Sequence, residues 1–294
     1  MGEDGFSAHA GDEYGKQLIY GQALNQSAAI FRVFVFIRGK IQMNHSWIIP
    51  DWPAPANVRA LQTTREGGVS VGAYATLNLG DHVGDDTVAV VRNRALLREA
   101  LPADPVWLKQ VHGNIVVDAD RTVGVPDADA ALSRQLGKVC AVMTADCLPL
   151  LICDEAGTVV AATHAGWRGL AGGVVEATVN AMNVAPERLM VWLGPAIGPA
   201  AFEVGEEVRQ AFMARDPAAE KAFVPSPVVS NQDSTLDTQK WLADIYLLAR
   251  QRLALLGVKQ VYGGGLCTYT DAERFYSYRR DQATGRMASL IWLA

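Results

Sequence analysis

Cysteine is scarce in this chain, and its few cysteines do not form the pattern of a disulfide-rich module. The 294 residues include Cys140, Cys147, Cys153 and Cys267, which lie in or beside apolar runs. Small secreted domains that depend on disulfides carry a much denser set of cysteines. The pattern therefore predicts reduced thiols and a cytoplasmic protein.

The chain also lacks an excess of basic residues. It carries 26 Lys and Arg against 31 Asp and Glu, which gives a formal net charge of -5. Nucleic-acid binding depends largely on Lys and Arg that neutralise phosphates, so this balance argues against a general nucleic-acid-binding protein. A few arginines can still bind a single phosphate group, and we expect small-molecule substrates.

Long apolar runs are missing as well. The run at residues 28–37 is interrupted by Arg32 and is about ten residues long, whereas a membrane-spanning helix needs about 20. Residues 1–27 are polar, glycine-rich and acidic at their start, unlike a secretory signal. We expect no membrane contact. We expect residues 1–42 to be a disordered or misassigned N-terminal extension, and residues 43–294 to form the catalytic domain.

Short apolar runs alternate with amphipathic segments beyond residue 58. The runs predict strands at 106–108, 139–143, 148–153, 159–163, 189–193, 260–262 and 288–293. Helical spacing predicts helices at about 86–101, 170–183, 203–214 and 238–256, the last capped by Asp237 or Thr238 and ended by Gly257. The pattern indicates a single α+β or α/β domain and leaves the order of the strands open.

Three separated fragments each offer one metal ligand beside a glycine or a turn. They are KQVHG with His112, TADCL with Cys147 and THAGWRG with His164. Zinc is bound by cysteine sulfur and histidine nitrogen, and three protein ligands leave a fourth position for water or substrate, as in catalytic sites. The fragments therefore predict a catalytic zinc site, with copper as the alternative metal.

The same residues allow other interpretations. A single histidine is more often a half-buried residue, and a cysteine in apolar surroundings often behaves as a small hydrophobic residue. Cys147 and His164 could instead be the nucleophile and base of a cysteine hydrolase, with Asp146 assisting. A closed, structural metal site would need a fourth ligand, for which Cys267 is the candidate.

Seven short strings carry a resemblance to a known family. They are TTREGGVS at 63–70, LNLG at 77–80, KQVHG at 109–113, TADC at 144–147, THAGWRG at 163–169, LGPAIG at 193–198 and FYSYRR at 275–280. Together, and in this order, they resemble the YfiH, or laccase-domain, family. The resemblance extends from about Trp47 to the C-terminus.

This resemblance implies a single α+β domain with a layered α-β-β-α core, and it places the family's zinc ligands on His112, Cys147 and His164. Members of the family were first described as copper-binding polyphenol oxidases. They are now regarded as purine nucleoside phosphorylases that also deaminate adenosine and cleave 5'-methylthioadenosine, and relatives have been called peptidoglycan editing factors. The leading expectation is a monomeric zinc enzyme that converts adenosine, inosine or 5'-methylthioadenosine and phosphate to the free base and a sugar 1-phosphate.

The residue inventory separates some of these activities. A multicopper oxidase needs many histidines for its copper centres. The chain has five, one of which, His9, lies in the expected extension. Deamination needs an activated water and a proton carrier. Asp146, beside a ligand, is a catalytic candidate together with Cys147 and His164, although a hydrogen bond that positions a neighbour is an equal alternative for it.

Phosphorolysis needs cations that hold phosphate. Arg65 lies beside two glycines, Arg168 lies in the GWRG turn, and Arg279 lies near the C-terminus. Arginine binds phosphate through a planar fork of N–H groups, so these three are the candidate phosphate-binding residues. A surface ion pair is the alternative for each.

Overall fold

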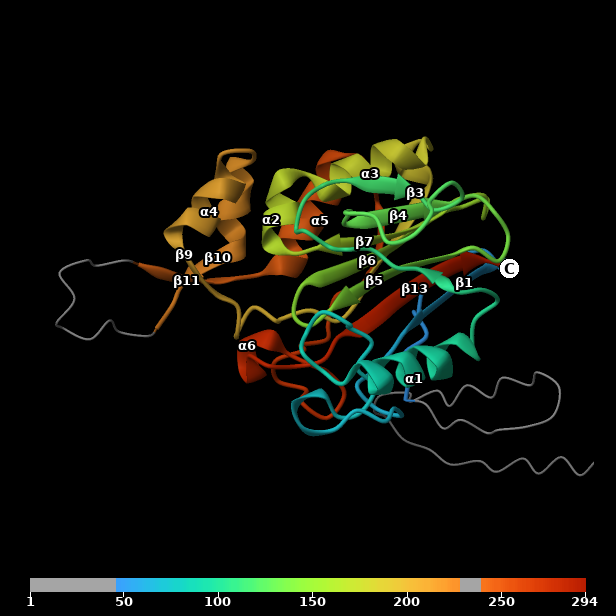
Figure 1. Ribbon diagram of the computed structural model, residues 1–294. Helices are drawn as coiled ribbons and strands as arrows, with labels where there is room; N and C mark the ends of the chain where they lie inside the picture. Colours follow the sequence, from blue (N-terminus) through green and yellow to red (C-terminus); the bar gives the residue numbers. More distant parts are fainter. Residues whose placement is uncertain (1–45, 228–238) are drawn as a thin grey trace, which may run out of the picture. The chain divides into compact units, whose positions relative to one another are not determined.

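Two β-sheets lie face to face in this protein, with helices on their outer faces (Figure 1). The structure, a computed structural model, describes residues 46–227 and 239–294. The first sheet has the order β1 (Val58–Gln62), β13 (Met287–Leu293), β5 (Val139–Thr144), β2 (Pro105–Val106). The second has the order β12 (Gln260–Gly263), β8 (Leu189–Leu193), β6 (Leu148–Asp154), β7 (Val160–Ala165), β4 (Ala130–Ser133), β3 (Val116–Asp118).

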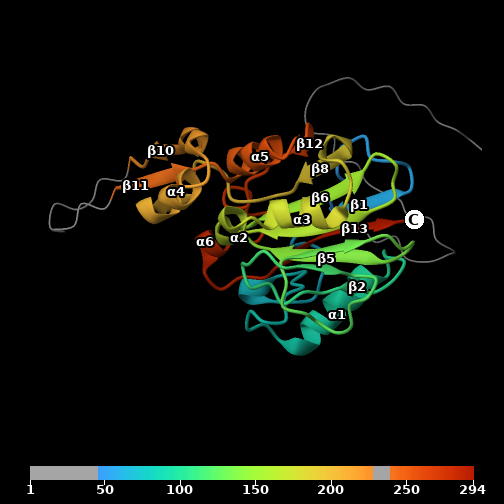
Figure 2. The ribbon, with the colours of Figure 1, turned by 90° about the horizontal axis from the view of Figure 1, so that it is seen from above.

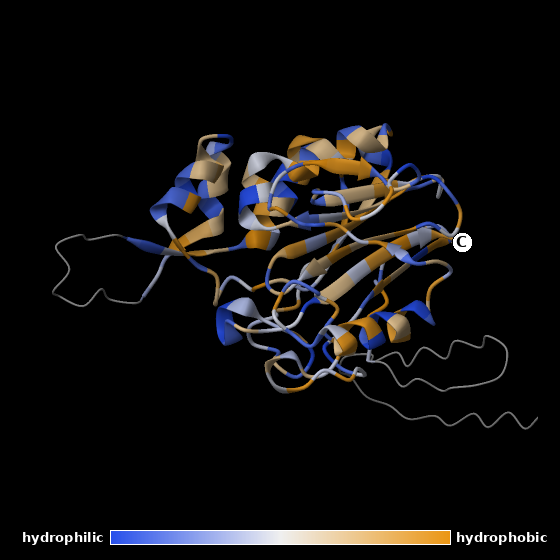
Figure 3. Cartoon of the chain, in the orientation of Figure 1, coloured by the Kyte–Doolittle hydropathy of each residue, from blue (hydrophilic) through white to orange (hydrophobic). Residues whose placement is uncertain are grey.

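The central strands are buried on both faces. In β6, Leu150 and Ile152 pack toward the helices, whereas Leu151 and Cys153 pack between the sheets. Side chains alternate between the faces of a strand, so a strand covered on both faces becomes a continuous apolar run. Figure 3 shows these layers as largely orange or pale, whereas α6 (Tyr278–Asp281) is blue. The buried thiols Cys140 and Cys153 belong to the core between the sheets, as expected for small hydrophobic residues.

Helices cover the two sheets from opposite sides. Leu97 of α1 (Thr87–Arg98) packs with Ala141 and Leu290 of the first sheet. The other side is covered by α2 (Trp167–Gly172), α3 (Val174–Met182) and α5 (Ile245–Leu255). Figure 1 shows the order α1, first sheet, second sheet, α3, which confirms the expected α-β-β-α layers.

A small third sheet lies beside these layers (Figure 2). Its strands, in the order β10, β11, β9, are antiparallel. Their bounds and those of the adjoining helices are β9 (Glu203–Gly205), α4 (Glu206–Met213), η3 (Pro217–Ala222), β10 (Phe223–Pro225) and β11 (Lys240–Ala243). Two further 3-10 helices are η1 (Gly72–Tyr74) and η2 (Pro186–Arg188).

The predicted strands correspond to observed ones, but two predicted helices begin too early. Residues 203–205 and 240–243 form strands β9 and β11, and α5 begins at Ile245, where Asp244 accepts the capping hydrogen bond from Leu247. The proposed caps Asp237 and Thr238 lie outside the described residues. The predicted helix at 170–183 is divided at Gly173, which has a φ of 95°. Helical spacing overlooked the third sheet because its strands are only three or four residues long.

The expected extension, residues 1–42, lies outside the described residues. Within residues 46–227 and 239–294, every helix is too short or too polar to pass through a membrane. These described residues all belong to one compact unit.

Candidate metal centre

His112 lies in a loop that is held by one buried carboxylate. The backbone N–H groups of His112 and Gly113 donate to Asp129 at 3.0 and 2.7 Å, and that of Val111 donates at 3.3 Å. His112 has a φ of 59°, a backbone region that residues other than glycine seldom adopt. Asp129 therefore stabilises a loop conformation that the local sequence would not favour by itself.

Cys147 and His164 are brought together by the hairpin of β6 and β7. Leu148 pairs with Ala165 in this hairpin, so Cys147, just before β6, lies opposite Gly166, just after β7. The β5–β6 turn that carries Cys147 is also the place where the chain passes from the first sheet to the second. The closeness of these two candidate ligands thus depends on strand register rather than on closeness in sequence.

Asp129 also sets the orientation of the His164 ring. Ala130 pairs with Thr163, and His164 N–H donates to the Asp129 carbonyl at 2.7 Å, so the two residues face each other across adjacent strands. The His164 Nδ1 lies 2.8 Å from Asp129 Oδ1, and both side chains are buried. An Nδ1–H that donates to a carboxylate leaves Nε2 as the free nitrogen, which is the usual arrangement for a metal-binding histidine.

The three candidate ligand atoms converge. One ligand atom from each of His112, Cys147 and His164 lies within 4.8 Å of the others. Cys147 Sγ lies 3.8 Å from His112 Nε2, and the two imidazole rings meet edge to face at 4.9 Å between centroids. A Cβ atom added at Gly166 would stand 2.9 Å from His112 Cδ2 and 3.0 Å from Cys147 Sγ. Glycine at this position is therefore what allows the ligands to approach.

The electrostatics of the cluster favour ionised groups. Burial raises the pKa of the Cys147 thiol. The charge of His164 and hydrogen bonds from His112 and His164 together outweigh this effect and lower the pKa to about 6. Burial lowers the pKa of His164, while the Cys147 thiolate and the bond to Asp129 raise it to about 9. Cys147 and His164 thus each favour the charged form of the other. A cation that binds here would release the proton from His164.

The donor set fits a divalent metal such as zinc. One thiolate and two imidazoles are typical zinc ligands, and three protein ligands are the number found in catalytic sites. Within the described part of the chain, Cys267 is not a member of this ligand group. Its sulfur accepts the Gly198 N–H at 3.2 Å instead. The arrangement thus favours an open, three-ligand site over the closed site that Cys267 would have completed.

Asp146 lies next to Cys147, but its carboxylate is already engaged. Thr268 Oγ1 donates to Oδ1 at 2.7 Å, and the backbone N–H of Arg279 donates to Oδ2 at 2.6 Å. Asp146 has a φ of 96°. These contacts tie the ligand-bearing turn to two C-terminal segments. They support a positioning role beside the proton-transfer role expected from the sequence.

The three predicted phosphate arginines have different surroundings. Arg65 donates to the carbonyls of Ala75 and Ala272 and lies over the Tyr276 ring. Arg168 is exposed and lies over Trp167. These two side chains thus make contacts of their own within the fold.

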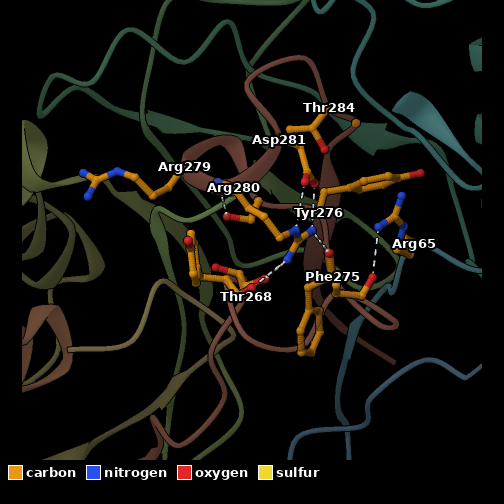
Figure 4. A network of polar contacts seen from close by, with 12 residues as sticks. Arg65, Thr268, Phe275, Tyr276, Arg279, Arg280, Asp281 and Thr284 are labelled. Carbon is orange, nitrogen blue, oxygen red and sulfur yellow. Dashed lines mark hydrogen bonds and ion pairs between the residues drawn. The ribbon is translucent and has the colours of Figure 1, made fainter. Parts of the chain in front are cut away.

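Arg279 and its neighbour Arg280 differ sharply (Figure 4). Arg280 lies within the network and donates to Thr268, Tyr269 and Phe275 carbonyls and to Asp281. The Arg279 side chain extends away from this network. It is exposed, its Nη1 donates to the Ala201 carbonyl at 3.3 Å, and its guanidinium lies over the Phe202 ring at 5.8 Å. Of this pair, Arg279 is the one whose guanidinium is available to a ligand.

Asp129 is the main site residue that the sequence interpretation missed. It stands in the string DADAAL at 127–132, where an acid enters an apolar strand. Such an acid is seldom fully buried unless it is paired. An aspartate within an apolar strand therefore indicates a buried partner, and this was the sequence feature that could have revealed Asp129. The hairpin was also readable, since the apolar runs 148–153 and 159–163 are separated by a short turn that contains Gly157.

Comparisons with known proteins agree on one family. Residues 59–294 match the family model described as multi-copper polyphenol oxidoreductase laccase. A Pseudomonas aeruginosa protein named purine nucleoside phosphorylase is 57% identical over 249 residues, which covers 85% of this chain and 99% of the relative. Escherichia coli purine nucleoside phosphorylase YfiH is 55% identical over 252 residues, which covers 84% of this chain and 98% of the relative.

Solved structures show the same fold. A Neisseria meningitidis protein is 53% identical, with a TM-score of 0.77, and the match covers 84% of this chain and 98% of that one. A Bacillus licheniformis protein called YfiH is 27% identical, with a TM-score of 0.71, and the match covers 81% and 93% of the two chains. The family-model match, residues 59–294, includes the segments that carry the three candidate ligands.

Proposed function

The chain belongs to the family described as multi-copper polyphenol oxidoreductase laccase, and from this membership we propose that it is a zinc-dependent purine nucleoside phosphorylase. Its substrates would be adenosine, inosine or 5'-methylthioadenosine together with phosphate, and adenosine deamination would be a second activity. The supporting observation is the cluster of His112, Cys147 and His164 around one position. Close relatives that are named purine nucleoside phosphorylases support the choice of reaction.

The proposal favours one zinc ion over a set of copper ions. Copper oxidases of the multicopper type need a blue-copper centre and further copper sites, each with several histidines. The chain has five histidines, and within the described residues a single ligand group is present. Copper would still compete for these ligands, because its affinity generally exceeds that of zinc.

In phosphorolysis, a phosphate oxygen bonds to C1' of the sugar while the bond from C1' to the base nitrogen breaks. The departing base gains the proton that hydrogen phosphate loses, so base and sugar 1-phosphate account for all atoms. Zinc, when bound, would act as a Lewis acid beside the reacting groups. His112, Cys147 and His164 would hold it, and Asp129 would fix the His164 ring through the bond at 2.8 Å.

The remaining site residues keep proposed roles. Arg65, Arg168 and Arg279 would hold phosphate by charge-assisted hydrogen bonds, a role that the exposure of Arg168 and Arg279 supports. Asp146 would carry a proton during deamination. Because its oxygens accept from Thr268 and Arg279, this role would require one of those hydrogen bonds to open.

We propose that the enzyme is a cytoplasmic monomer that acts on small molecules and has no nucleic-acid or membrane partner. The formal net charge of -5 supports the absence of nucleic acid. The free thiols Cys140 and Cys153 support a reducing compartment. Burial raises the pKa of Cys153 to about 12, so that thiol stays protonated and inert.

The first test is an assay of the purified full chain with adenosine, with and without phosphate, on samples of known metal content. We expect adenine and ribose 1-phosphate only when phosphate is present, at about one zinc per chain, since three ligands form one site. His112→Ala should abolish turnover and lower zinc content. His82→Ala is the matched control, because His82 is an exposed histidine beside Asp81, outside the ligand group. Inosine formed without phosphate would indicate the proposed deamination. Free adenine released without phosphate, or full activity without metal, would contradict the proposal.

A cysteine hydrolase is the second candidate, and one observation favours it. Cys147 has a low thiol pKa beside His164, and Asp129 orients that imidazole, which resembles a nucleophile, base and orienting acid. A metal-bound thiolate is not free to attack a substrate. A zinc-free protein whose Cys147 reacts quickly with iodoacetamide, and which does not turn over nucleosides, would support this candidate, with cell-wall precursors as the substrates to try.

A further inference from the structure

Arg286 stands beside the turn that carries Asp146 and Cys147. It immediately precedes β13, whose first residue, Met287, pairs with Thr144 at the end of β5. The antiparallel register therefore places Arg286 opposite Ala145, next to the ligand-bearing turn. The pairing of β13 with β5 therefore brings this arginine to the site.

The backbone and the stem of Arg286 are fixed. Its N–H donates to Asn78 Oδ1 at 2.8 Å, and its carbonyl accepts from the Leu79 N–H at 3.1 Å. A Cβ atom added at Gly80 would stand only 2.8 Å from the Cγ of Arg286. The side chain therefore packs closely over that glycine. A guanidinium on such a stem is preorganised, which reduces the entropy lost when it binds a ligand.

The guanidinium is half-buried and has no acidic partner of its own. Its Nη1 donates to the carbonyls of Thr284 and Gly285, both at 3.0 Å. Among the ion pairs of the described residues, none includes Arg286, whereas Arg280 is paired with Asp281 at 2.8 Å. A partly buried charge is costly unless an opposite charge faces it. An anion bound to this guanidinium would therefore stabilise it.

The charges that act on Arg286 belong to the site. Burial lowers the pKa of Arg286, and the strongest opposing effects come from the charges of Cys147 and then Asp146. A divalent metal on Cys147 would neutralise the thiolate, and Asp146 is engaged by Thr268 and Arg279. Asp146 keeps its charge, but none of the ion pairs among the described residues joins it to Arg286, so the guanidinium would remain open to another anion.

We propose that Arg286 binds the phosphate substrate beside the metal centre, an inference that rests on the proposed phosphorylase function. The Arg286 stem over Gly80 aims the charge, and the carbonyls of Thr284 and Gly285 hold one N–H edge of the guanidinium. The rest of the guanidinium makes charge-assisted hydrogen bonds to phosphate oxygens. This assignment adds a rigid, half-buried cation to the exposed side chains of Arg168 and Arg279.

The test measures binding of inorganic phosphate to the zinc-loaded full chain by titration calorimetry, together with phosphorolysis kinetics. Arg286→Gln should weaken phosphate binding by about 10- to 100-fold, the effect of losing a hydrogen-bonded charge, with unchanged zinc content. Arg286→Lys should fall between Arg286→Gln and the unchanged chain, because lysine keeps the charge and loses the fork. Arg121→Gln is the charge-matched control, since Arg121 is 89% exposed and lies beyond the far end of β3 from His112.

The outcomes separate the two proposals. Unchanged phosphate affinity in Arg286→Gln overturns the assignment, even when the unchanged chain is an active phosphorylase. Weaker phosphate binding in the variant of a chain that does not cleave nucleosides supports the anion site and contradicts the proposed function. If Arg286→Gln does not fold, Arg286→Lys decides, and an unchanged affinity in that variant overturns the assignment.

Discussion

Asp129 and Asp154 lie near opposite ends of the β6–β7 hairpin, and both are buried carboxylates that accept backbone N–H groups. Asp154 accepts from Thr158 and Val159 at 2.7 and 3.0 Å and closes the turn. Asp129 accepts from His112 and Gly113 and, in addition, lies 2.8 Å from the His164 ring. The two ends of the hairpin therefore differ in one group, the His164 imidazole that contacts Asp129. A carboxylate that organises amides fixes a loop, whereas one that also holds an imidazole fixes a reactive group.

The largest expected effect comes from Asp129→Asn. An amide side chain can no longer accept every N–H that reaches Asp129, and it loses the charge opposite His164. We expect zinc affinity to fall about 10- to 100-fold, as for other residues that orient metal ligands. The free energy of unfolding should fall by about 3 kcal/mol or more, because several hydrogen bonds to a charged group are lost.

Competition with a chromogenic chelator measures the first quantity, and denaturant unfolding measures the second. An Asp129→Asn protein that binds zinc as tightly as the unchanged chain would show that the carboxylate is only a loop-holding group, like Asp154.

A smaller effect is expected from Gly166→Ala, which adds one methyl group between the ligands. The backbone of Gly166 has a φ of -60°, so an alanine is conformationally acceptable there and only the contacts with His112 and Cys147 oppose it. Overpacking of this kind typically costs about 1–3 kcal/mol. We expect a loss in zinc affinity of about five- to tenfold, which corresponds to the lower part of that range.

Gly172→Ala is the matched control for that substitution. Gly172 is the last residue of α2, the helix that begins directly after Gly166, and its added Cβ would meet nothing within 4 Å. We expect unchanged zinc affinity and a slightly higher thermal midpoint, because alanine favours helix more than glycine does. Equal zinc affinity in the two alanine variants would contradict the steric interpretation of Gly166.

The smallest effect is expected from Asp154→Asn, at the end of the hairpin without an imidazole. Burial raises the pKa of Asp154, but hydrogen bonds from Thr158 and Val159 hold it below its ordinary range. We expect the free energy of unfolding to fall by about 1–3 kcal/mol at neutral pH, and zinc affinity to stay unchanged.

The pH dependence of this difference has a definite sign. The folded pKa is below the unfolded value of about 3.9, so the stabilisation is present above about pH 4 and is lost as pH falls through the folded pKa. Unfolding curves of both proteins between neutral and acidic pH should converge at low pH. A difference that grows on acidification would rule out the ionised carboxylate as its source.

Much of the two central layers could be predicted because their strands are buried on both faces. Continuous apolar runs such as 148–153 and 189–193 are visible without any partner, and they correspond to β6 and β8. The strands β9 and β11 could not be recognised, because three- and four-residue strands leave no periodicity. Leu242 fits the helical spacing of α5, although it lies in β11.

The candidate ligands could be proposed from residue type, but their convergence could not be derived from spacing. His112, Cys147 and His164 meet through hairpin register and through the pairing of β4 with β7, which depends on contacts distant in sequence. Arg286 escaped notice for the same reason, since it reaches the site across the pairing of β13 with β5. The role of Asp129 could not be predicted without knowing that its side chain is buried.

The positive φ angles of His112 and Asp146 lower the stability of the fold at two residues of the proposed site. Both residues adopt a backbone region that disfavours side chains, and the left-handed conformation costs a residue other than glycine about 1–2 kcal/mol. Glycine would relax the chain at either place. At residue 112 it would also remove a proposed metal ligand, and at residue 146 the carboxylate that accepts from Thr268 and Arg279. A search for stabilised variants of this protein would therefore select against its own site, and such a search should leave these two positions untouched.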